Sequence, residues 1–289
     1  MSKKGIILKG IGGFYYVKAD DGITYETKAR GRFRKEGIKP LAGDVVDIAD
    51  GWIENIYERK NVLIRPPVAN AELLLIVISA SLPVPDMVMI DKLILYGKKS
   101  GLEVILAINK IDEGRTAAEE IAEQYKNAEI KTVLMSNHTG EGIEELKAII
   151  RGKCTCLAGQ SAVGKSSFVN ALSPSLQLET GDIIKKTEKG KQTTRQSELI
   201  YLDEIEGSIV DTPGFAVLEA LDIEPEELQN LYPEFKNVGN CRFKGCIHDK
   251  EADCAVKMAV KDGRINKRRY ARYLVIFEEL KQRRLEKYD

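Results

Sequence analysis

The sequence has few of the features that mark secreted and membrane proteins. It contains five cysteines, an odd number, and three of them lie close together. This count argues against a framework of paired disulfides and favours a reducing compartment. No apolar run is long enough to span a bilayer, and the residues after Met1 lead into a strand pattern without a secretion signal. We therefore expect a cytoplasmic protein that does not contact a membrane.

An excess of one charge sign is also absent. The 289 residues carry 44 basic and 44 acidic side chains, so the formal net charge is zero. The overall charge therefore does not indicate a polyanionic partner, although local clusters of basic residues can bind one. The length is sufficient for two or three domains.

Three segments of the chain differ in pattern. Residues 1–68 contain short β-type runs separated by glycine, which predicts a small closed barrel of the OB-fold type. Residues 69–222 alternate strand and helix patterns, which predicts a mostly parallel sheet with helices on both faces. Residues 223–289 are predicted to be helical, and residues 65–67 form the predicted linker after the barrel. The fold class is therefore multidomain α/β with a β-barrel before the sheet and helices after it.

A phosphate-binding loop lies in the second segment. Residues 159–166 match G-x-x-x-x-G-K-S between a strand pattern at 154–158 and a helix pattern at 166–172. The glycines let backbone N–H groups face the phosphates, and the start of the helix favours an anion. Lys165 is expected to reach the β- and γ-phosphates, and Ser166 is expected to ligate Mg²⁺. The nucleotide contacts predicted here are Gly159, Gln160, Ser161, Ala162, Val163, Gly164, Lys165, Ser166 and Ser167.

A guanine-reading motif precedes this loop. The N-K-x-D sequence from Asn109 through Lys110 to Asp112 follows the apolar run 103–108. The Asp112 carboxylate can accept hydrogen bonds from N1–H and N2–H₂ of guanine, a pair that adenine does not offer. The aliphatic part of Lys110 can lie along the base. Ser136 and Asn137, after the strand pattern at 131–135, lie where a second guanine-contacting loop is expected, and Ser136 is expected to contact guanine. The alternative is a simple turn before a helix at 142–150.

A third motif, D-x-x-G, begins at Asp211 and ends at Gly214. Asp211 is expected to hold Mg²⁺ through water, and the N–H of Gly214 is expected to sense the γ-phosphate. Phe215 stands where many GTPases carry a glutamine that orients the attacking water. An apolar side chain cannot orient water, so intrinsic hydrolysis should be slow, or the water must be positioned from elsewhere.

The segment 180–195, between these two phosphate motifs, is rich in Gly, Lys and Thr. Thr193 and Thr194 are the candidates for the threonine that ligates Mg²⁺ when GTP is bound. The plainer interpretation is a flexible basic loop, and both interpretations hold together because such switch segments order only with GTP.

The order of the three motifs is rotated. An ordinary GTPase has the phosphate loop first, then D-x-x-G and then N-K-x-D. Here N-K-x-D comes first and D-x-x-G last, which indicates a circularly permuted GTPase.

A cluster of metal-binding side chains lies in the third segment. Three cysteines and one of the two histidines of the chain occur within fourteen residues. Three thiolates and an imidazole suit one tetrahedral structural Zn²⁺ ion, and so small a segment can depend on the metal to fold. The alternative is a set of reduced cysteines in a small core. The predicted zinc ligands are Cys241, Cys246, His248 and Cys254. Cys154 and Cys156 are predicted to be core residues without a redox role.

Two basic stretches are candidates for RNA binding. Residues 28–35 of the predicted barrel carry five lysines and arginines with Phe33 between them. Such stretches can bind phosphates without reading sequence, and barrels of this type often bind nucleic acid. The alternative for each stretch is a solvated, charge-balanced face. The second stretch is a C-terminal helix pattern with Arg264, Lys267, Arg268, Arg269, Arg272, Tyr270 and Tyr273.

Together these residues resemble the RsgA/YjeQ family of circularly permuted bacterial GTPases. The resemblance covers nearly the whole chain, from the run at 29–35 and the residues 40–44 through the rotated motifs to the zinc cluster. It implies a GTPase that binds the small ribosomal subunit and its 16S rRNA, assists late maturation of that subunit, and leaves after hydrolysis that the subunit stimulates. The resemblance also implies GTP or GDP, Mg²⁺ and one Zn²⁺ as ligands, and we expect a monomer.

The resemblance also implies a catalytic set with one departure from the family pattern. Family members usually show G-[R/K]-H-T-T-T, and this chain has Gln192 at the histidine position. Gln192 can orient a water by hydrogen bonding, but it cannot act as an imidazole base. The expected catalytic residues are Lys165, Thr194 and Gln192.

Two other function classes remain open at this point. A signalling or trafficking GTPase with a protein activator would not respond to ribosomal subunits. An RNA-binding scaffold that has lost turnover would bind nucleotide without hydrolysing it, and Phe215 and Gln192 are compatible with that.

Overall fold

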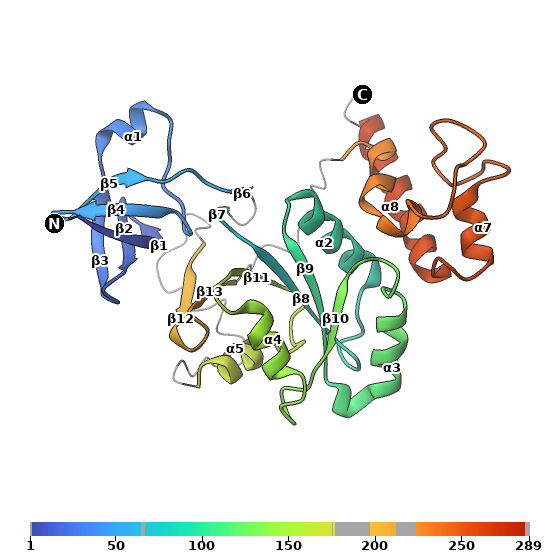
Figure 1. Ribbon diagram of the computed structural model, residues 1–289, viewed down its shortest axis with the longest axis horizontal. Coiled ribbons are helices and arrows are strands. Elements are labelled where there is room, and N and C mark those ends of the chain that lie inside the picture. The colour runs from blue at the N-terminus through green and yellow to red at the C-terminus, as the bar shows by residue number, and fades with distance from the viewer. Residues whose placement is uncertain (1, 65–66, 175, 177–196, 212–222, 287–289) are drawn as a thin grey trace.

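The structure is a computed structural model that describes residues 2–64, 67–174, 176, 197–211 and 223–286. Figure 1 shows three parts: a β-barrel, a sheet covered by helices, and a group of helices at the C-terminal end. We call them the barrel region (3–56), the sheet region (73–211) and the helical region (223–286). None of the described helices is both long enough and apolar enough to cross a membrane.

The barrel region confirms the predicted OB-type barrel. Its strands close in the order β1-β2-β3-β5-β4, with a parallel contact between β3 and β5 and antiparallel contacts elsewhere. Alternate strand residues such as Ile7, Val17 and Ile53 point inward and form a small apolar core. The elements are β1 Lys3–Ile11, β2 Phe14–Ala19, β3 Thr24–Ala29, α1 Gly31–Lys35, β4 Val45–Ala49 and β5 Trp52–Ile56.

The same core includes the aromatic residue of the basic stretch at 28–35. Phe33 is 5% exposed and packs inside the barrel, where it anchors α1. It therefore cannot stack on a nucleic-acid base, although the arginines on either side of it remain exposed.

A short hairpin follows the barrel at the predicted linker. Strands β6 (Val62–Ile64) and β7 (Pro67–Ala69) pair with each other. The buried carboxylate of Asp44 accepts hydrogen bonds from Arg59 at 2.7 and 2.8 Å and from the Leu41 N–H at 2.7 Å. The connection is therefore a structured hairpin beside a buried ion pair, although residues 65 and 66 lie outside the described ranges.

The sheet region is a six-stranded sheet in the order β10-β9-β8-β11-β13-β12. Only the edge strand β12 runs antiparallel to its neighbour. This confirms the mostly parallel sheet predicted from the alternating pattern. Its elements are β8 Leu73–Ser79, α2 Met87–Lys99, β9 Glu103–Asn109, α3 Ile111–Glu123, β10 Lys131–Leu134, α4 Ile143–Ile150, β11 Cys154–Ala158, α5 Lys165–Leu172, β12 Leu199–Leu202, the 3-10 turn η1 Asp203–Ile205 and β13 Gly207–Asp211.

The central strand β8 explains why helices cover both faces. All seven of its residues are buried, as expected for a strand between two helical layers. Leu74 and Ile76 pack toward α2 and α3, whereas Leu75 and Val77 pack toward α4 and α5. Because β9 and β11 flank β8 and run parallel to it, the loops at their carboxyl ends meet at one edge of the sheet.

Local residues set both ends of helix α2. The Asp86 carboxylate accepts hydrogen bonds from the N–H groups of Val88 and Met89, both at 3.1 Å, and so caps the helix. Gly101 follows the helix with a φ of 71°, a conformation that glycine adopts without strain.

The helical region contains two 3-10 turns and two α-helices around a core of aromatic rings. Tyr232, Phe235 and Tyr273 contact one another with ring centroids 5.0 to 5.1 Å apart. The elements are η2 Pro225–Leu231, η3 Pro233–Phe235, α7 Ala255–Lys261 and α8 Lys267–Glu286. Helix α8 packs against α2 of the sheet region.

Candidate nucleotide site and metal centre

The predicted phosphate loop connects β11 to α5, as the motif requires. Gly159 has a φ of 138°, and a Cβ at this position would lie 2.1 Å from the Val77 carbonyl oxygen. Gly164 has a φ of 100° and directly precedes α5. Both glycines are therefore required by the backbone, and the N-terminus of α5 faces the loop as an anion-binding end.

The side chains of the loop divide into two groups. Val163 is fully buried, so this residue can contact a nucleotide only through its backbone. The Lys165 ammonium donates to the carbonyl oxygens of Gly159 at 2.8 Å and Gln160 at 2.7 Å, which holds it over the loop. The remaining predicted contacts of the loop, from Ser161 to Ser167, are exposed or half-buried.

The N-K-x-D motif lies at the end of β9, beside this loop. Asn109 is 2% exposed, and its Nδ2 donates to the Val163 carbonyl oxygen at 2.8 Å. Lys110 has a φ of 64°, and its ammonium donates to the Leu82 carbonyl oxygen. Asn109 thus ties the base-reading strand to the phosphate loop, and the structure brings together two motifs that are 50 residues apart in sequence.

The carboxylate of Asp112 is ionised and partly exposed, so it can accept hydrogen bonds from a ligand. The side-chain hydroxyl of Ser136 donates to it, which is the largest of the effects that lower the pKa of Asp112. The side chain is 25% exposed. An ionised, partly exposed carboxylate can accept both hydrogen bonds that guanine offers.

Ser136 lies beneath the loop that follows β10. It is fully buried, and its Oγ also accepts from the N–H groups of His138 at 3.1 Å and Thr139 at 3.0 Å. Its hydroxyl orients Asp112 and shapes the loop. The chain thus forms a turn over Ser136, and the contact of this loop with guanine stays a prediction.

The D-x-x-G motif begins at the last residue of β13. The backbone of Asp211 pairs with Leu157 of β11, which places it beside the strand that leads into the phosphate loop. Residues 212–222 lie outside the described ranges, and so does 177–196. The predicted roles of Gln192, Thr193, Thr194 and Gly214, and the position of Phe215, therefore stay predictions.

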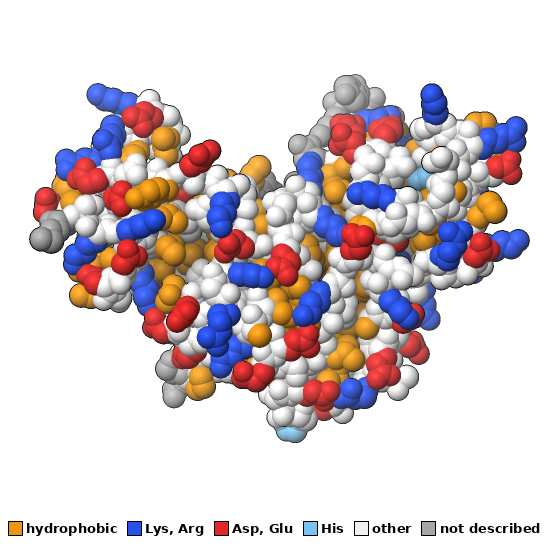
Figure 2. Space-filling model, viewed as in Figure 1, with side chains coloured by type: hydrophobic (Ala, Val, Ile, Leu, Met, Phe, Trp, Pro, Cys, Tyr) orange, Lys and Arg blue, Asp and Glu red, His pale blue; other side chains and the backbone are white. Residues whose placement is uncertain are grey.

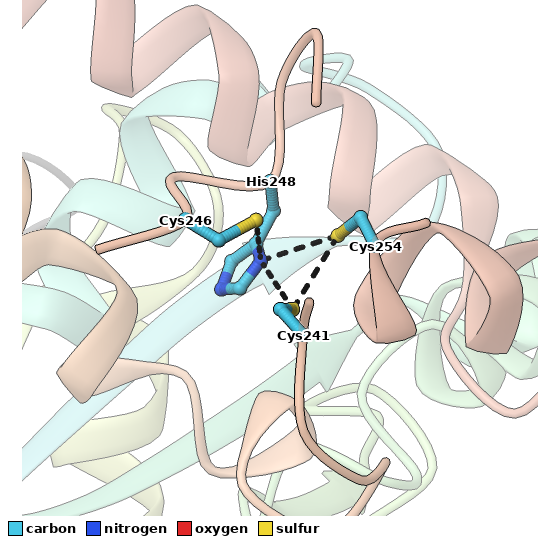
Figure 3. A group of neighbouring side chains, drawn as sticks. All are labelled: Cys241, Cys246, His248 and Cys254. Carbon is cyan, nitrogen blue, oxygen red and sulfur yellow. Dashed lines mark hydrogen bonds between the residues drawn. The ribbon is translucent and has the colours of Figure 1, made fainter. Parts of the chain in front are cut away.

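The four predicted metal ligands of the helical region converge (Figure 3). The Nδ1 atom of His248 lies 3.6, 3.4 and 3.3 Å from the sulfur atoms of Cys241, Cys246 and Cys254. The sulfur atoms of Cys241 and Cys254 are 3.8 Å apart. Sulfur ligands about 2.3 Å from a tetrahedral zinc ion are roughly 3.8 Å apart, so the four side chains fit one Zn²⁺.

Neighbouring residues hold these ligands in place, and the sequence motif does not indicate them. The Glu251 carboxylate accepts from the N–H groups of Ile247 at 2.7 Å and Asp249 at 2.8 Å. The hydroxyl of Tyr270 donates to the His248 carbonyl oxygen at 2.7 Å. Burial lowers the pKa of His248, which favours the neutral imidazole that binds metals.

The cysteines of β11 are core residues, as predicted. Burial raises the pKa of Cys154 to about 11 and also raises the pKa of Cys156. Neither thiol is ionised near neutral pH, so neither is a reactive thiolate.

Only some residues of the C-terminal basic stretch lie on the surface, which corrects the expectation that the whole stretch is available to bind RNA. Arg269 is 2% and Arg272 is 8% exposed, and Tyr273 is fully buried. Arg269 Nη1 lies 2.7 Å from Asp91 Oδ1, and Arg272 Nε lies 2.5 Å from Asp91 Oδ2. Asp91 belongs to α2, so these arginines join the helical region to the sheet region and do not face solvent.

Three further groups complete this ion cluster. Arg269 also binds the buried carboxylate of Glu234 in η3. The Tyr125 hydroxyl donates to Asp91 Oδ1 at 2.8 Å, and Arg272 donates to Gln124 at 2.7 Å. Two carboxylates and two guanidinium groups balance in charge, as buried ions require.

Comparisons with known proteins agree with this geometry. The sequence model of the RsgA GTPase family matches residues 56–221, and the model of the RsgA N-terminal domain matches residues 4–53. A protein of Caldanaerobacter subterraneus named small ribosomal subunit biogenesis GTPase RsgA is 42% identical over 292 residues, which cover 99% of this chain and 98% of the relative. A protein of the same name from Agathobacter rectalis is 41% identical over 299 residues, which cover 96% of this chain and 98% of the relative.

Solved structures match over the same length. The crystal structure of YjeQ from Thermotoga maritima superposes with a TM-score of 0.84 at 37% identity and covers 97% of this chain and 99% of its own. The structure of YloQ, described as a circularly permuted GTPase, superposes with a TM-score of 0.78 at 34% identity. The match covers 98% of this chain and 96% of the YloQ chain.

Proposed function

The chain belongs to the RsgA family of GTPases, and from this premise we propose that it binds the small ribosomal subunit and assists its late maturation. In this proposal the chain hydrolyses GTP to GDP and phosphate, and the subunit stimulates the hydrolysis. The full-length similarity to proteins named for small-subunit biogenesis carries the choice of partner.

The observation that carries the guanine-nucleotide assignment is the junction of the two motifs at one edge of the sheet. The Asn109 amide binds the Val163 carbonyl oxygen of the phosphate loop, and three residues later Asp112 presents its carboxylate. A ligand that satisfies both loops has a guanine base and phosphates. We assign Asp112 and Lys110 to the base and residues 159–167 to the phosphates.

The catalytic assignment rests on positioning and electrostatics. Lys165 and the backbone N–H groups of the loop stabilise the charge that develops on the transferred phosphoryl group. Ser166, Thr194 and Asp211 are the residues that would hold Mg²⁺, which supplies further positive charge at the phosphates. Gln192 is the proposed residue that orients the attacking water, and the subunit would fix its segment for that purpose.

We propose that the three parts of the chain have separate tasks. Residues 1–68 would bind 16S rRNA, residues 69–222 would bind and hydrolyse GTP, and residues 223–289 would bind zinc and add contacts to the subunit. Arg30 and Arg32 are exposed on the barrel, and Arg264, Lys267 and Arg268 remain available on the helical region. The protein would act in the cytoplasm as a monomer.

The charges on the surface favour local phosphate contacts. On the face drawn in Figure 2, lysines and arginines are interspersed with aspartates and glutamates over all three parts. A single positive face is therefore not what guides the chain to RNA on this side. Exposed cations of the barrel beside aromatic rings, such as Lys28 with its ammonium 4.7 Å from the centroid of the Phe14 ring, fit both phosphate and base contacts.

Co-sedimentation tests this proposal. The protein is mixed with purified small or large subunits, with GDP or with a GTP analogue that is not hydrolysed, and the pelleted fraction is measured at several salt concentrations. We expect binding to small subunits with the analogue, weaker binding with GDP, and a decrease with salt. Equal behaviour with both subunits, or no binding, would favour a signalling GTPase; binding without any turnover would favour a scaffold.

A further inference from the structure

The turn before α5 is held by two asparagine side chains, and only one of them belongs to a recognised motif. Asn109 of the N-K-x-D motif donates to the Val163 carbonyl oxygen at 2.8 Å. Asn137, which follows β10, donates through Nδ2 to the carbonyl oxygen of the next residue, Gly164, also at 2.8 Å. Two consecutive carbonyl groups of the phosphate loop are therefore each bound by an amide.

These two amides are themselves linked. The backbone N–H of Asn137 donates to Asn109 Oδ1 at 3.2 Å. A Cβ on Gly164 would lie 2.3 Å from Asn109 Nδ2 and 2.7 Å from Asn137 Nδ2. The absence of a side chain at Gly164 is thus what lets both amides reach the backbone.

The consequence for ligand binding follows from peptide geometry. In a planar trans peptide the C=O and N–H groups point in opposite directions. The two amides, together with the Phe168 N–H, which also donates to the Gly164 carbonyl oxygen at 2.9 Å, hold the carbonyl groups of Val163 and Gly164 on one side. The N–H groups of Gly164 and Lys165 are therefore directed to the other side. Those N–H groups belong to the loop that cradles phosphates.

We propose that Asn137 is a positioning residue that fixes the phosphate loop from the base-reading loop. It acts on the nucleotide phosphates through the Gly164 peptide, and it does not read the base, which is the role of Asp112. This inference rests on the proposed guanine nucleotide as the ligand. It predicts that the side chain at 137 affects the phosphate part of the binding energy and leaves the choice of base unchanged.

The isosteric variant Asn137→Asp gives the sharper test. It keeps the shape of the side chain but places an oxygen against the Gly164 carbonyl oxygen, and it adds a negative charge beside the phosphate loop. Asn137→Ala only removes the donor. The control variant is Thr139→Ala in the same loop, because Thr139 Oγ1 accepts only from the Glu141 N–H, at 3.4 Å, and does not touch the phosphate loop.

The experiment measures the dissociation rates of fluorescent GDP and IDP from full-length protein. IDP lacks the N2 amine that Asp112 recognises. We expect Asn137→Ala to speed dissociation of both nucleotides about five- to tenfold, the size of one lost hydrogen bond. Asn137→Asp should speed it further, Thr139→Ala should leave it unchanged, and the GDP-to-IDP ratio should be that of the wild type in all three.

Three outcomes would overturn the proposal. One is an unchanged dissociation rate in both variants at position 137. Another is a loss of the preference for GDP over IDP, which would assign Asn137 to base reading. A third is equal loss in Asn137→Ala and Asn137→Asp together with a lower melting temperature of the nucleotide-free protein, which would assign it to general stability. Failure of the wild-type protein to bind GDP would instead refute the proposed function.

Discussion

The helical region and the barrel region contact the sheet region by different kinds of ion pair. At the helical region the ions are buried: Asp91, Arg269 and Arg272 are at most 8% exposed. At the barrel region they reach solvent: Lys9 binds Glu198 at 2.7 Å with both side chains about 30% exposed, and Lys18 binds Asp203 at 2.7 Å. Beside the ion pairs of the barrel region, Ile6 and Leu8 of β1 make a small apolar contact with the core of the sheet region.

This difference indicates which of the two regions has a fixed orientation relative to the sheet region. Removing one partner of a buried ion pair leaves an uncompensated charge, so the buried cluster is stable in one arrangement only. Exposed pairs contribute little and can be replaced by water. We therefore expect the helical region to be rigidly attached to the GTPase and the barrel region to be attached more weakly. Under the proposed function, this weaker attachment would let the barrel adjust to an RNA surface while the helical region keeps its place.

The largest effect on this comparison should come from the metal ligands. Cys254→Ser removes one of four zinc ligands, and we expect loss of the ion and a destabilisation of the helical region by several kcal/mol or more. Zinc content and near-ultraviolet circular dichroism of the tyrosines measure this. The matched variant Cys154→Ser, at a cysteine outside the cluster, should keep one zinc per chain. Unchanged zinc content in Cys254→Ser would contradict the ligand assignment.

Loss of the central carboxylate should have the next largest effect. Asp91→Ala leaves the guanidinium groups of Arg269 and Arg272 without their shared partner, and we expect a loss of about 3–5 kcal/mol in the free energy of unfolding. Urea denaturation measures it. Glu279→Ala is the control, because Glu279 pairs with Lys92 across the same two helices but is 41% exposed. A loss of the same small size in both variants would remove the contrast between buried and exposed ion pairs.

A much smaller effect is expected at the barrel. Lys18 lies 3.9 Å from the Tyr201 ring centroid and pairs with Asp203, whose side chain is 82% exposed. A double-mutant cycle of Lys18→Ala and Asp203→Ala should give a coupling energy below about 1 kcal/mol that decreases further with salt. A coupling energy as large as that between Asp91 and Arg272 would show that the barrel is held as firmly as the helical region.

The smallest expected effect is a change in the pH dependence of stability at acidic pH. The Asp21 carboxylate accepts hydrogen bonds from the Lys3 ammonium, the Ile23 N–H and the Tyr25 hydroxyl. These bonds lower the pKa of Asp21 to about 2. A depressed carboxyl pKa stabilises the fold above the ordinary pKa near 4, and this contribution is lost as the pH falls toward 2. Because the group is exposed, the change should be slight. Asp21→Asn should remove it, so a stability curve between pH 5 and 2 identical to that of the wild type would contradict the assignment.

The sequence predicts those parts of the molecule whose chemistry is local. A phosphate loop needs its glycines, lysine and serine within eight residues, and the zinc ligands lie within fourteen, so spacing alone identifies both. The capping of α2 by Asp86 and its stop before Gly101 are equally local. The fold class followed from the change in periodicity after the barrel.

Other features depend on partners far away in the chain. Arg269 and Arg272 look like surface residues in a basic stretch, but their partner Asp91 is 178 and 181 positions away. Phe33 stands among arginines, yet the closed barrel buries it. Asn137 looks like a turn residue until Gly164, 27 positions later, lies against it. Composition and spacing do not report such pairings, because the topology of the sheet and barrel creates them.

GTP turnover by the purified protein, alone and with added small or large ribosomal subunits, tests the proposed function most directly. We predict slow turnover alone, because Phe215 cannot orient water, and strong stimulation by the small subunit only. The variants Gln192→Ala and Ser166→Ala should lose the stimulated rate. A rate that does not respond to the small subunit, or that responds equally to both subunits, would contradict a GTPase that depends on the small subunit.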